Sequence, residues 1–130
     1  MSSESAPATK VTRPYKERHS LEERKKLAKT IFEKNPDHVP VILERAAKSQ
    51  LKEIKGCRKV IISANFSASR LLMEIRRKIE LQDHESVFIF FGNGNALPSM
   101  TMTLGELHKM YADEDGFLYV NYYEESVYGN

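Results

Sequence analysis

The chain has 130 residues, of which 41% are hydrophobic, enough apolar material for the core of one domain of ordinary size. Its net charge of +2 hides an asymmetry, because residues 1–60 hold 15 basic and 8 acidic side chains and residues 61–130 hold 5 and 10. A basic half attracts acidic peptides, anionic lipid or nucleic acid, and charge alone does not separate these partners. A single cysteine excludes an internal disulfide, the apolar runs are far shorter than a membrane span of ~20 residues, and no secretory leader is visible. We therefore expect a protein of the cytosol or nucleus.

The N-terminal part predicts an arm followed by a helix. Residues 1–12 are rich in serine and almost devoid of apolar side chains, so we expect a flexible arm. Ser20 and Glu23 have the spacing of a capping box, in which each side chain satisfies a backbone N–H at the start of a helix. The helix should end at Asn35-Pro36, with Arg24 among the charged residues on its solvent side.

The middle of the chain predicts two strands, a helix and a third strand. Residues 39–43 and 58–64 are apolar and rich in β-branched side chains, so each predicts a strand. A stripe of leucine and isoleucine at helical spacing follows Ser67. It predicts an amphipathic helix that crosses from the second strand to a third strand at residues 86–91.

The C-terminal part predicts a short helix, a strand and a tail. Thr103 and Glu106 form a second capping box ahead of an apolar helix face. Residues 113–116 predict a turn, residues 117–123 a last strand, and residues 124–130 an extended polar tail. Two strands, a crossover helix and two further strands describe an α+β domain of the β-grasp kind. In such a domain a four-stranded mixed sheet wraps over the crossover helix, here with an extra helix in front.

Signals for catalysis or cofactor binding are weak. Gly92-Asn93-Gly94 lacks the rest of a nucleotide-binding fingerprint and predicts a hairpin turn. The acidic residues 113–115 lack the spacing of a calcium loop, so we expect a solvated turn. The four histidines are scattered, and no motif supplies a base for Cys57. The sequence therefore predicts neither an enzyme nor a bound metal or cofactor.

The C-terminus points to a protein that is itself a substrate. Gly129 lies one residue from the end. A terminal glycine has no Cβ, so an extended tail can enter the narrow channels of enzymes that activate a carboxylate and transfer the acyl group. Asn130 would have to be removed first. Taken alone, the glycine fits a frayed terminus better.

Four ordered segments are more specific: His38-Val39-Pro40-Val41-Ile42-Leu43-Glu44, Val87-Phe88-Ile89-Phe90-Phe91, Asp115-Gly116-Phe117-Leu118-Tyr119-Val120 and Tyr128-Gly129. Together they resemble the autophagy-related ubiquitin-like modifiers, the GABARAP and light-chain-three family, also called the autophagy-related protein eight family. The similarity runs from about Leu21 to Gly129. It implies a ubiquitin-like β-grasp domain with additional N-terminal helices, spanning residues 13–123 between the arm and the tail.

The same resemblance implies a fate for the tail. A cysteine protease would cleave after Tyr128-Gly129 and release Asn130, and E1-like and E2-like enzymes would then activate Gly129 as a thioester. Amide linkage to phosphatidylethanolamine would move the protein from the cytoplasm to autophagosomal membranes.

Family members also bind short receptor motifs, which add a strand to a sheet edge and place an aromatic and an aliphatic anchor in two apolar pockets. Residues 59–63 would be that edge here. The resemblance assigns the aromatic pocket to Ile31, Pro40, Ile61 and Phe117, guarded by Lys59, and the aliphatic pocket to Val60, Ile62, Phe66 and Leu71. Each of these side chains, considered alone, is typical of an ordinary core.

Three further residues receive roles from the resemblance. Arg76 and Lys78 would meet the conjugation enzymes, although unaided they belong to a solvated helix face. His38 stands where the family usually has a basic residue, so it would attract the acidic flank of a receptor motif less strongly than arginine. Because imidazole titrates in the physiological range, we expect this contact to strengthen as the pH falls. Leu27 stands where the family usually has an acidic residue, and Ser63 stands where it usually has proline.

Two functions from different classes remain open from the sequence. The first is a lipid-conjugated modifier that recruits cargo receptors to autophagosomal membranes. The alternative is an unconjugated ubiquitin-like module that binds peptides and has an idle tail. Nucleic-acid binding ranks lowest, because no strand pair interleaves aromatic residues with Arg or Lys.

Overall fold

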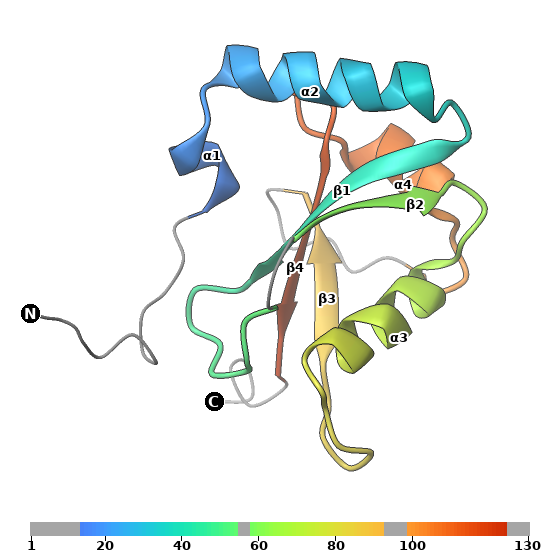
Figure 1. The fold of residues 1–130 in the computed structure, drawn as a ribbon. Coiled ribbons are helices and arrows are strands. Elements are labelled where there is room, and N and C mark those ends of the chain that lie inside the picture. The colour runs from blue at the N-terminus through green and yellow to red at the C-terminus, as the bar shows by residue number, and fades with distance from the viewer. Residues whose placement is uncertain (1–13, 55–57, 93–98, 125–130) are drawn as a thin grey trace, which may run out of the picture.

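The fold is a four-stranded sheet between two helical layers (Figure 1). The structure is a computed structural model that describes residues 14–54, 58–92 and 99–124. The predicted arm at 1–12, Cys57 and the tail residues Tyr128, Gly129 and Asn130 lie outside the described residues. In chain order the elements are α1 (Tyr15–Arg18), α2 (Leu21–Lys34), β1 (His38–Arg45), β2 (Lys59–Ser63), α3 (Ala68–Lys78), β3 (Phe88–Phe91), α4 (Leu104–Tyr111) and β4 (Leu118–Tyr123).

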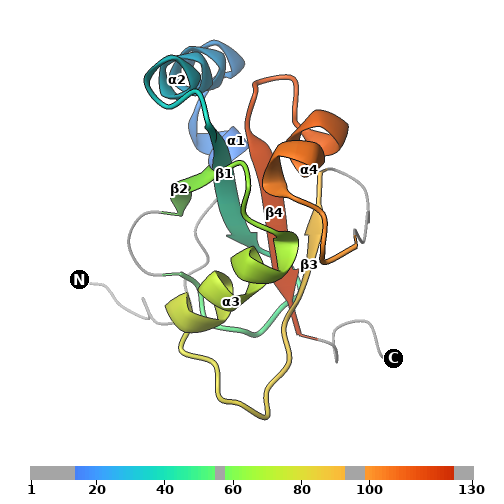
Figure 2. The ribbon, with the colours of Figure 1, turned by 90° about the vertical axis from the view of Figure 1, so that its right-hand side faces the viewer.

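The sheet has the strand order β2-β1-β4-β3. β1 pairs antiparallel with β2 and parallel with β4, and β3 pairs antiparallel with β4. α3 connects β2 to β3 and crosses one face of the sheet, as Figure 2 shows. The four-stranded mixed sheet with a crossover helix, predicted from the sequence, is therefore present.

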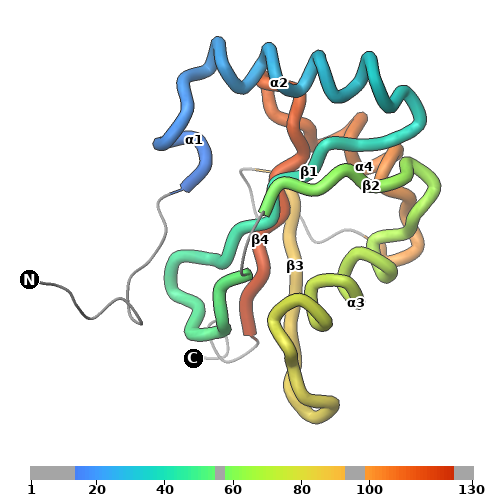
Figure 3. Tube along the Cα trace, viewed as in Figure 1, coloured from blue at the N-terminus to red at the C-terminus, as the bar shows by residue number. Residues whose placement is uncertain are grey.

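Two hydrophobic clusters hold the layers together, one on each face of the sheet. Residues of β1 alternate between them, because successive strand side chains point to opposite faces. Val41 and Leu43 belong to the larger cluster, under α3 and α4, and Ile42 belongs to the smaller cluster, under α1 and α2. β1 is therefore apolar on both sides, which is why its sequence shows a continuous apolar run. Figure 3 traces these layers along the chain.

Local hydrogen bonds start the helices where the sequence predicts. The Ser20 hydroxyl accepts from the backbone N–H of Glu23 at 3.2 Å, and the Glu23 carboxylate accepts from the Ser20 N–H at 2.9 Å. Thr103 and Glu106 make the same reciprocal pair at α4. Both predicted capping boxes are confirmed. The four-residue α1 was not predicted from periodicity, because one helical turn has too few residues to show a repeat.

Two predictions made from the sequence are wrong. The acidic turn at 113–115 is only partly solvated, since Glu114 is exposed but Asp115 is 2% exposed, and Arg24 does not lie on the solvent side of its helix. The Arg24 guanidinium donates to the Asp115 carboxylate at 2.7 Å, across the boundary between α2 and the turn before β4. A buried carboxylate requires such a partner, because its desolvation is otherwise too costly.

Candidate peptide-binding groove

β2 forms one end of the sheet, and its register with β1 decides which way its side chains point. Val60 lies opposite Val41 and Ile62 opposite Val39, both of which belong to the cluster under α3. Lys59 lies opposite Ile42, which belongs to the cluster under α2. Val60 and Ile62 therefore face α3, whereas Lys59 and Ile61 face the side of α2. The sheet edge separates the two predicted pockets onto opposite faces.

A groove of about 340 Å³ runs between β2 and α3. All four residues predicted for the aliphatic pocket line it. The complete lining is His38, Leu43, Val60, Ile61, Ile62, Ser63, Phe66, Leu71, Glu74 and Lys78. Leu71, which is 1% exposed, forms the buried floor of the groove, and half-buried residues of β2 form a wall. Such a concave, mostly apolar surface beside an end strand has the shape that accepts an aliphatic side chain of an extended peptide.

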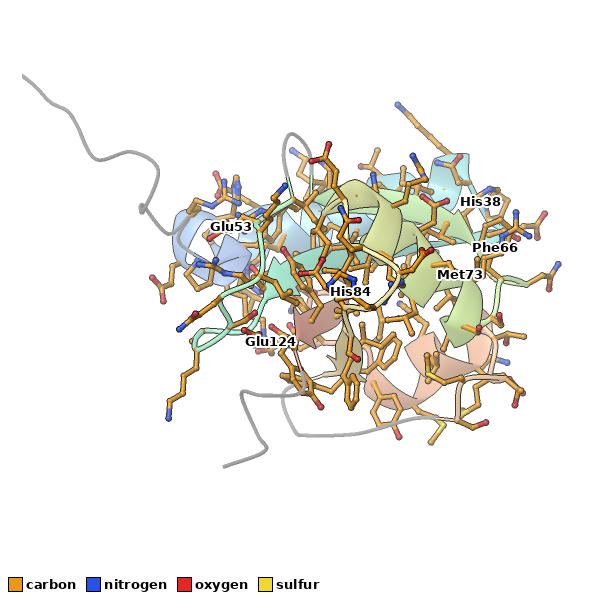
Figure 4. All side chains as sticks on the ribbon, turned by 90° about the horizontal axis from the view of Figure 1, so that it is seen from below. His38, Glu53, Phe66, Met73, His84 and Glu124 are labelled. Carbon is orange, nitrogen blue, oxygen red and sulfur yellow. The ribbon has the colours of Figure 1, made fainter. Side chains whose placement is uncertain are left out.

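Polar groups border this groove. His38, Glu74 and Lys78 contribute to its lining, and Glu74 forms an ion pair with Arg77. The Nδ1 atom of His38 is buried and has no hydrogen-bond partner among the described residues. His38 and Phe66 lie on the same side of the molecule in Figure 4. A groove occupant therefore meets hydrogen-bonding groups as well as apolar walls.

The residues predicted for the aromatic pocket lie on the side of the sheet that α2 covers. Pro40 lies opposite Ile61 in the register, and Ile61 is 43% exposed. Ile31 and Phe117 are buried together in the cluster under α2. The pairing between β1 and β4 begins at Val41, so Pro40, which has no backbone N–H, costs that pairing no hydrogen bond. Ile61 is therefore the exposed residue of this set, Lys59 is half-buried, and Ile31 and Phe117 are buried.

A polar network ties the N-terminal helices to the same side of the sheet. The Asp115 carboxylate accepts from Arg24, from the Tyr119 hydroxyl at 2.6 Å and from the backbone N–H of Phe117 at 2.8 Å. Burial, followed by the hydrogen bond to Asp115, raises the pKa of Tyr119 well above its usual value, so this phenol stays a donor. Sequence spacing could have revealed the buried role of Arg24, because it precedes the buried residues Ala28 and Ile31 by four and seven positions.

The two residues predicted to meet conjugation enzymes differ in their surroundings. The Arg76 guanidinium donates to the backbone carbonyl oxygens of Gln82 at 2.9 Å and Glu85 at 2.7 Å. It therefore holds the loop between α3 and β3, whereas Lys78 borders the groove.

None of the helices in the described part of the chain is both long and apolar enough to cross a membrane.

Two comparisons with known proteins match this chain. The family model described as "Autophagy protein Atg8 ubiquitin like" matches residues 23–129. The chain belongs to the Atg8 family. A crystal structure of Trypanosoma brucei ATG8 superposes with a TM-score of 0.79 at 26% identity, covering 88% of this chain and 96% of that one. The ubiquitin-like β-grasp fold predicted for this Atg8-family chain is thereby confirmed.

Sequence reasoning missed some of the residues that border the groove of this Atg8-family domain. Ser63 and Glu74 line it and were not predicted, and Arg70 lies over the ring of the lining residue Phe66. A spacing of four residues connects Phe66, Arg70, Glu74 and Lys78. This spacing puts the three residues within α3 on one helix face and was the available signal.

Proposed function

We propose that this Atg8-family protein is a modifier cleaved after Gly129 and conjugated through that residue to phosphatidylethanolamine on autophagosomal membranes. The observation that carries this proposal is the family match, which extends through the tail to residue 129. Hydrolysis of the peptide bond between Gly129 and Asn130 frees a carboxyl group. E1-like and E2-like enzymes carry this carboxyl as a thioester, and the lipid amine then attacks the acyl carbon, forms an amide and releases the thiol.

Membrane attachment in this proposal comes from the lipid and not from the folded domain. Each buried CH₂ of an acyl chain contributes about 0.8 kcal/mol, so the two chains of one phospholipid hold the protein on a bilayer. The protein itself catalyses nothing, and Arg76 and Lys78 are proposed contacts of the conjugation enzymes. It acts from the cytoplasm until lipidation moves it to the autophagosome.

Cargo receptors would bind beside β2 as an added strand. Their aliphatic anchor enters the groove lined by Val60, Ile62, Phe66 and Leu71. Their aromatic anchor enters beside Lys59 and Ile61, with Pro40, Ile31 and Phe117 beneath. His38, which lines the groove, contacts the acidic flank of the motif. Backbone pairing supplies affinity, and the two pockets supply specificity.

Intact-mass analysis of the protein from starved cells tests the conjugation step. We expect a form that ends at Gly129, lighter than the full chain by one asparagine residue, and a heavier lipidated form. A Gly129→Ala variant is the matched control and should yield neither product. Recovery of only the full chain with Asn130 would contradict conjugation and favour the unconjugated peptide-binding module.

Peptide binding is tested by placing a carboxylate in each pocket. Ile61→Asp should abolish binding of a receptor peptide, because the charge would be desolvated against the aromatic anchor. Leu71→Asp should also abolish it, but Leu71 is 1% exposed and the variant can unfold, so Phe66→Ser is the companion test of the aliphatic pocket. Met73→Asp, at a 67% exposed position of α3, is the control. Unchanged affinity in both Ile61→Asp and Phe66→Ser would place the peptide site elsewhere.

A further inference from the structure

Arg70 is held against the wall of the groove. Its guanidinium carbon lies 4.1 Å from the centroid of the Phe66 ring, over the ring face. Phe66 lines the groove, and Arg70 lies in the first turn of α3, where its backbone N–H donates to the Ser67 hydroxyl at 3.1 Å. Stacking on an aromatic face restricts the plane of a guanidinium and keeps its charge. Arg70 is thus a cation in a limited set of orientations at the groove border.

The charge of Arg70 is available to a ligand. Across residues 14–54, 58–92 and 99–124, no hydrogen bond or ion pair engages its guanidinium, and the side chain is exposed. The acidic residue one turn further along α3, Glu74, is paired with Arg77. A stacked guanidinium still presents N–H groups around its edge, in the fork that matches both oxygens of a carboxylate.

The charges around the groove favour an acidic occupant. Glu74 is the one acidic residue in its lining, and Arg77 balances it, whereas Lys78 and Arg70 add two positive charges. An occupant with a carboxylate beside its aliphatic anchor would meet this excess. Charge complementarity at the rim of a binding site changes affinity by modest factors but discriminates between ligands of similar shape.

We propose that Arg70 is a specificity-determining residue that binds a carboxylate adjacent to the aliphatic anchor of the receptor peptide. The inference rests on the proposed function, since it needs a peptide in the groove. The Phe66 ring orients the guanidinium, which then pairs with a glutamate or aspartate of the peptide while the neighbouring aliphatic side chain fills the groove.

A double-mutant cycle across the interface tests the pairing. The probes are synthetic peptides with an aromatic and an aliphatic anchor and a single glutamate at one position flanking the aliphatic anchor, each compared with its glutamine isostere. Their Kd values are measured with the wild-type protein, with Arg70→Gln and with the control Lys29→Gln. Lys29 is an exposed residue of α2, on the opposite side of the sheet from the groove. Lys29→Gln therefore lowers the net charge by one, as Arg70→Gln does, without changing the groove.

At one flanking position the glutamate peptide should bind the wild type about fivefold more tightly than its glutamine isostere. This ratio should fall below about twofold in Arg70→Gln and stay unchanged in Lys29→Gln. Arg70→Lys should restore part of the ratio, because it keeps the charge without the planar fork. The wild-type ratio should also shrink in high salt, since the pair is exposed to solvent.

The outcomes separate this inference from the proposed function. If Arg70→Gln weakens the glutamate and glutamine peptides equally at every position, Arg70 only supports the Phe66 wall. The proposed specificity role is then wrong, but peptide binding in the groove is still supported. If the wild type binds none of the peptides, the receptor groove and the role of Arg70 both fail. Thermal unfolding of Arg70→Gln should match the wild type, which excludes a folding defect as the cause.

Discussion

The buried ion pair between Arg24 and Asp115 provides the most demanding test of the folding argument. It joins α2 to the turn before β4 over a separation of 91 residues. The side chains are 11% and 0% exposed, so water compensates neither charge well. The perturbation is Arg24→Met, which keeps an unbranched side chain of helical propensity and removes only the charged end.

The expected cost follows from what remains around Asp115. Removal of one partner of a buried pair costs about 3–5 kcal/mol, because the other charge stays buried without compensation. Asp115 keeps its hydrogen bonds from the Tyr119 hydroxyl and the Phe117 N–H. We therefore expect the lower end, about 3 kcal/mol, which corresponds to a fall of roughly 10 °C in the thermal midpoint.

Urea unfolding followed by circular dichroism measures this free energy. The control is Lys52→Met, which removes the same kind of charge from the exposed pair between Lys52 and Glu80, whose side chains are 65% and 69% exposed. That loss should cost no more than about 0.5 kcal/mol. In the double variant Arg24→Met with Asp115→Asn the uncompensated charge is gone, so part of the stability should return.

Two results would contradict this expected cost. The first is a cost below about 1 kcal/mol for Arg24→Met, which would mean that the pair behaves like a surface pair. The second is a double variant no more stable than Arg24→Met alone. In that case the cost arises from lost packing of the arginine stem and not from the carboxylate left behind.

Four further outcomes are expected. Glu80→Gly should raise the free energy of unfolding by about 1 kcal/mol, because Glu80 follows α3 with a φ of 57°, and a lower urea midpoint would contradict this. Gly116→Ala should lower it by roughly 1–3 kcal/mol, since Gly116 has a φ of 96° and a new Cβ would lie 3.0 Å from that of Ala28, and an unchanged midpoint would oppose the argument. Burial would raise the pKa of Asp113, but the hydrogen bonds from Lys16 and from the backbone N–H of Asp115, together with the charges of Lys16 and Arg24, outweigh burial and hold this pKa below its usual value. A lowered pKa stabilises the folded protein above the unfolded pKa and loses this effect as the pH falls through the folded value, so between about pH 5 and pH 2 the thermal midpoint should fall more steeply in the wild type than in Asp113→Asn. Finally, His38→Arg should bind acidic-flanked peptides more tightly than the wild type, because arginine always carries its charge, whereas unchanged affinity would show that this position makes no such contact.

Sequence patterns were sufficient where the interactions that form an element are local. The capping boxes at Ser20 and Thr103 involve residues three positions apart, and both start helices as predicted. The family resemblance named Val60, Ile62, Phe66 and Leu71, which are among the residues that line the groove, and their role in binding a peptide stays a prediction.

Patterns were insufficient where charge is buried by a distant segment. The acidic turn that contains Asp115 has the composition of a solvated loop, and only α2, which packs over it, makes it an interior site. Arg70 differs from Arg24, since it stays exposed and stacks on Phe66 only four residues away, a contact that the spacing could have indicated. Composition describes what a side chain prefers, not what covers it.

Sequence patterns alone thus specified the order of elements from α2 to β4, the starts of α2 and α4, and the family, since these depend on contacts within a few residues and on short motifs. The tertiary structure alone decided which polar groups lose their water and where β2 and α3 leave a hollow between them. Those properties arise when segments distant in the chain pack together, and a one-dimensional pattern does not specify that packing.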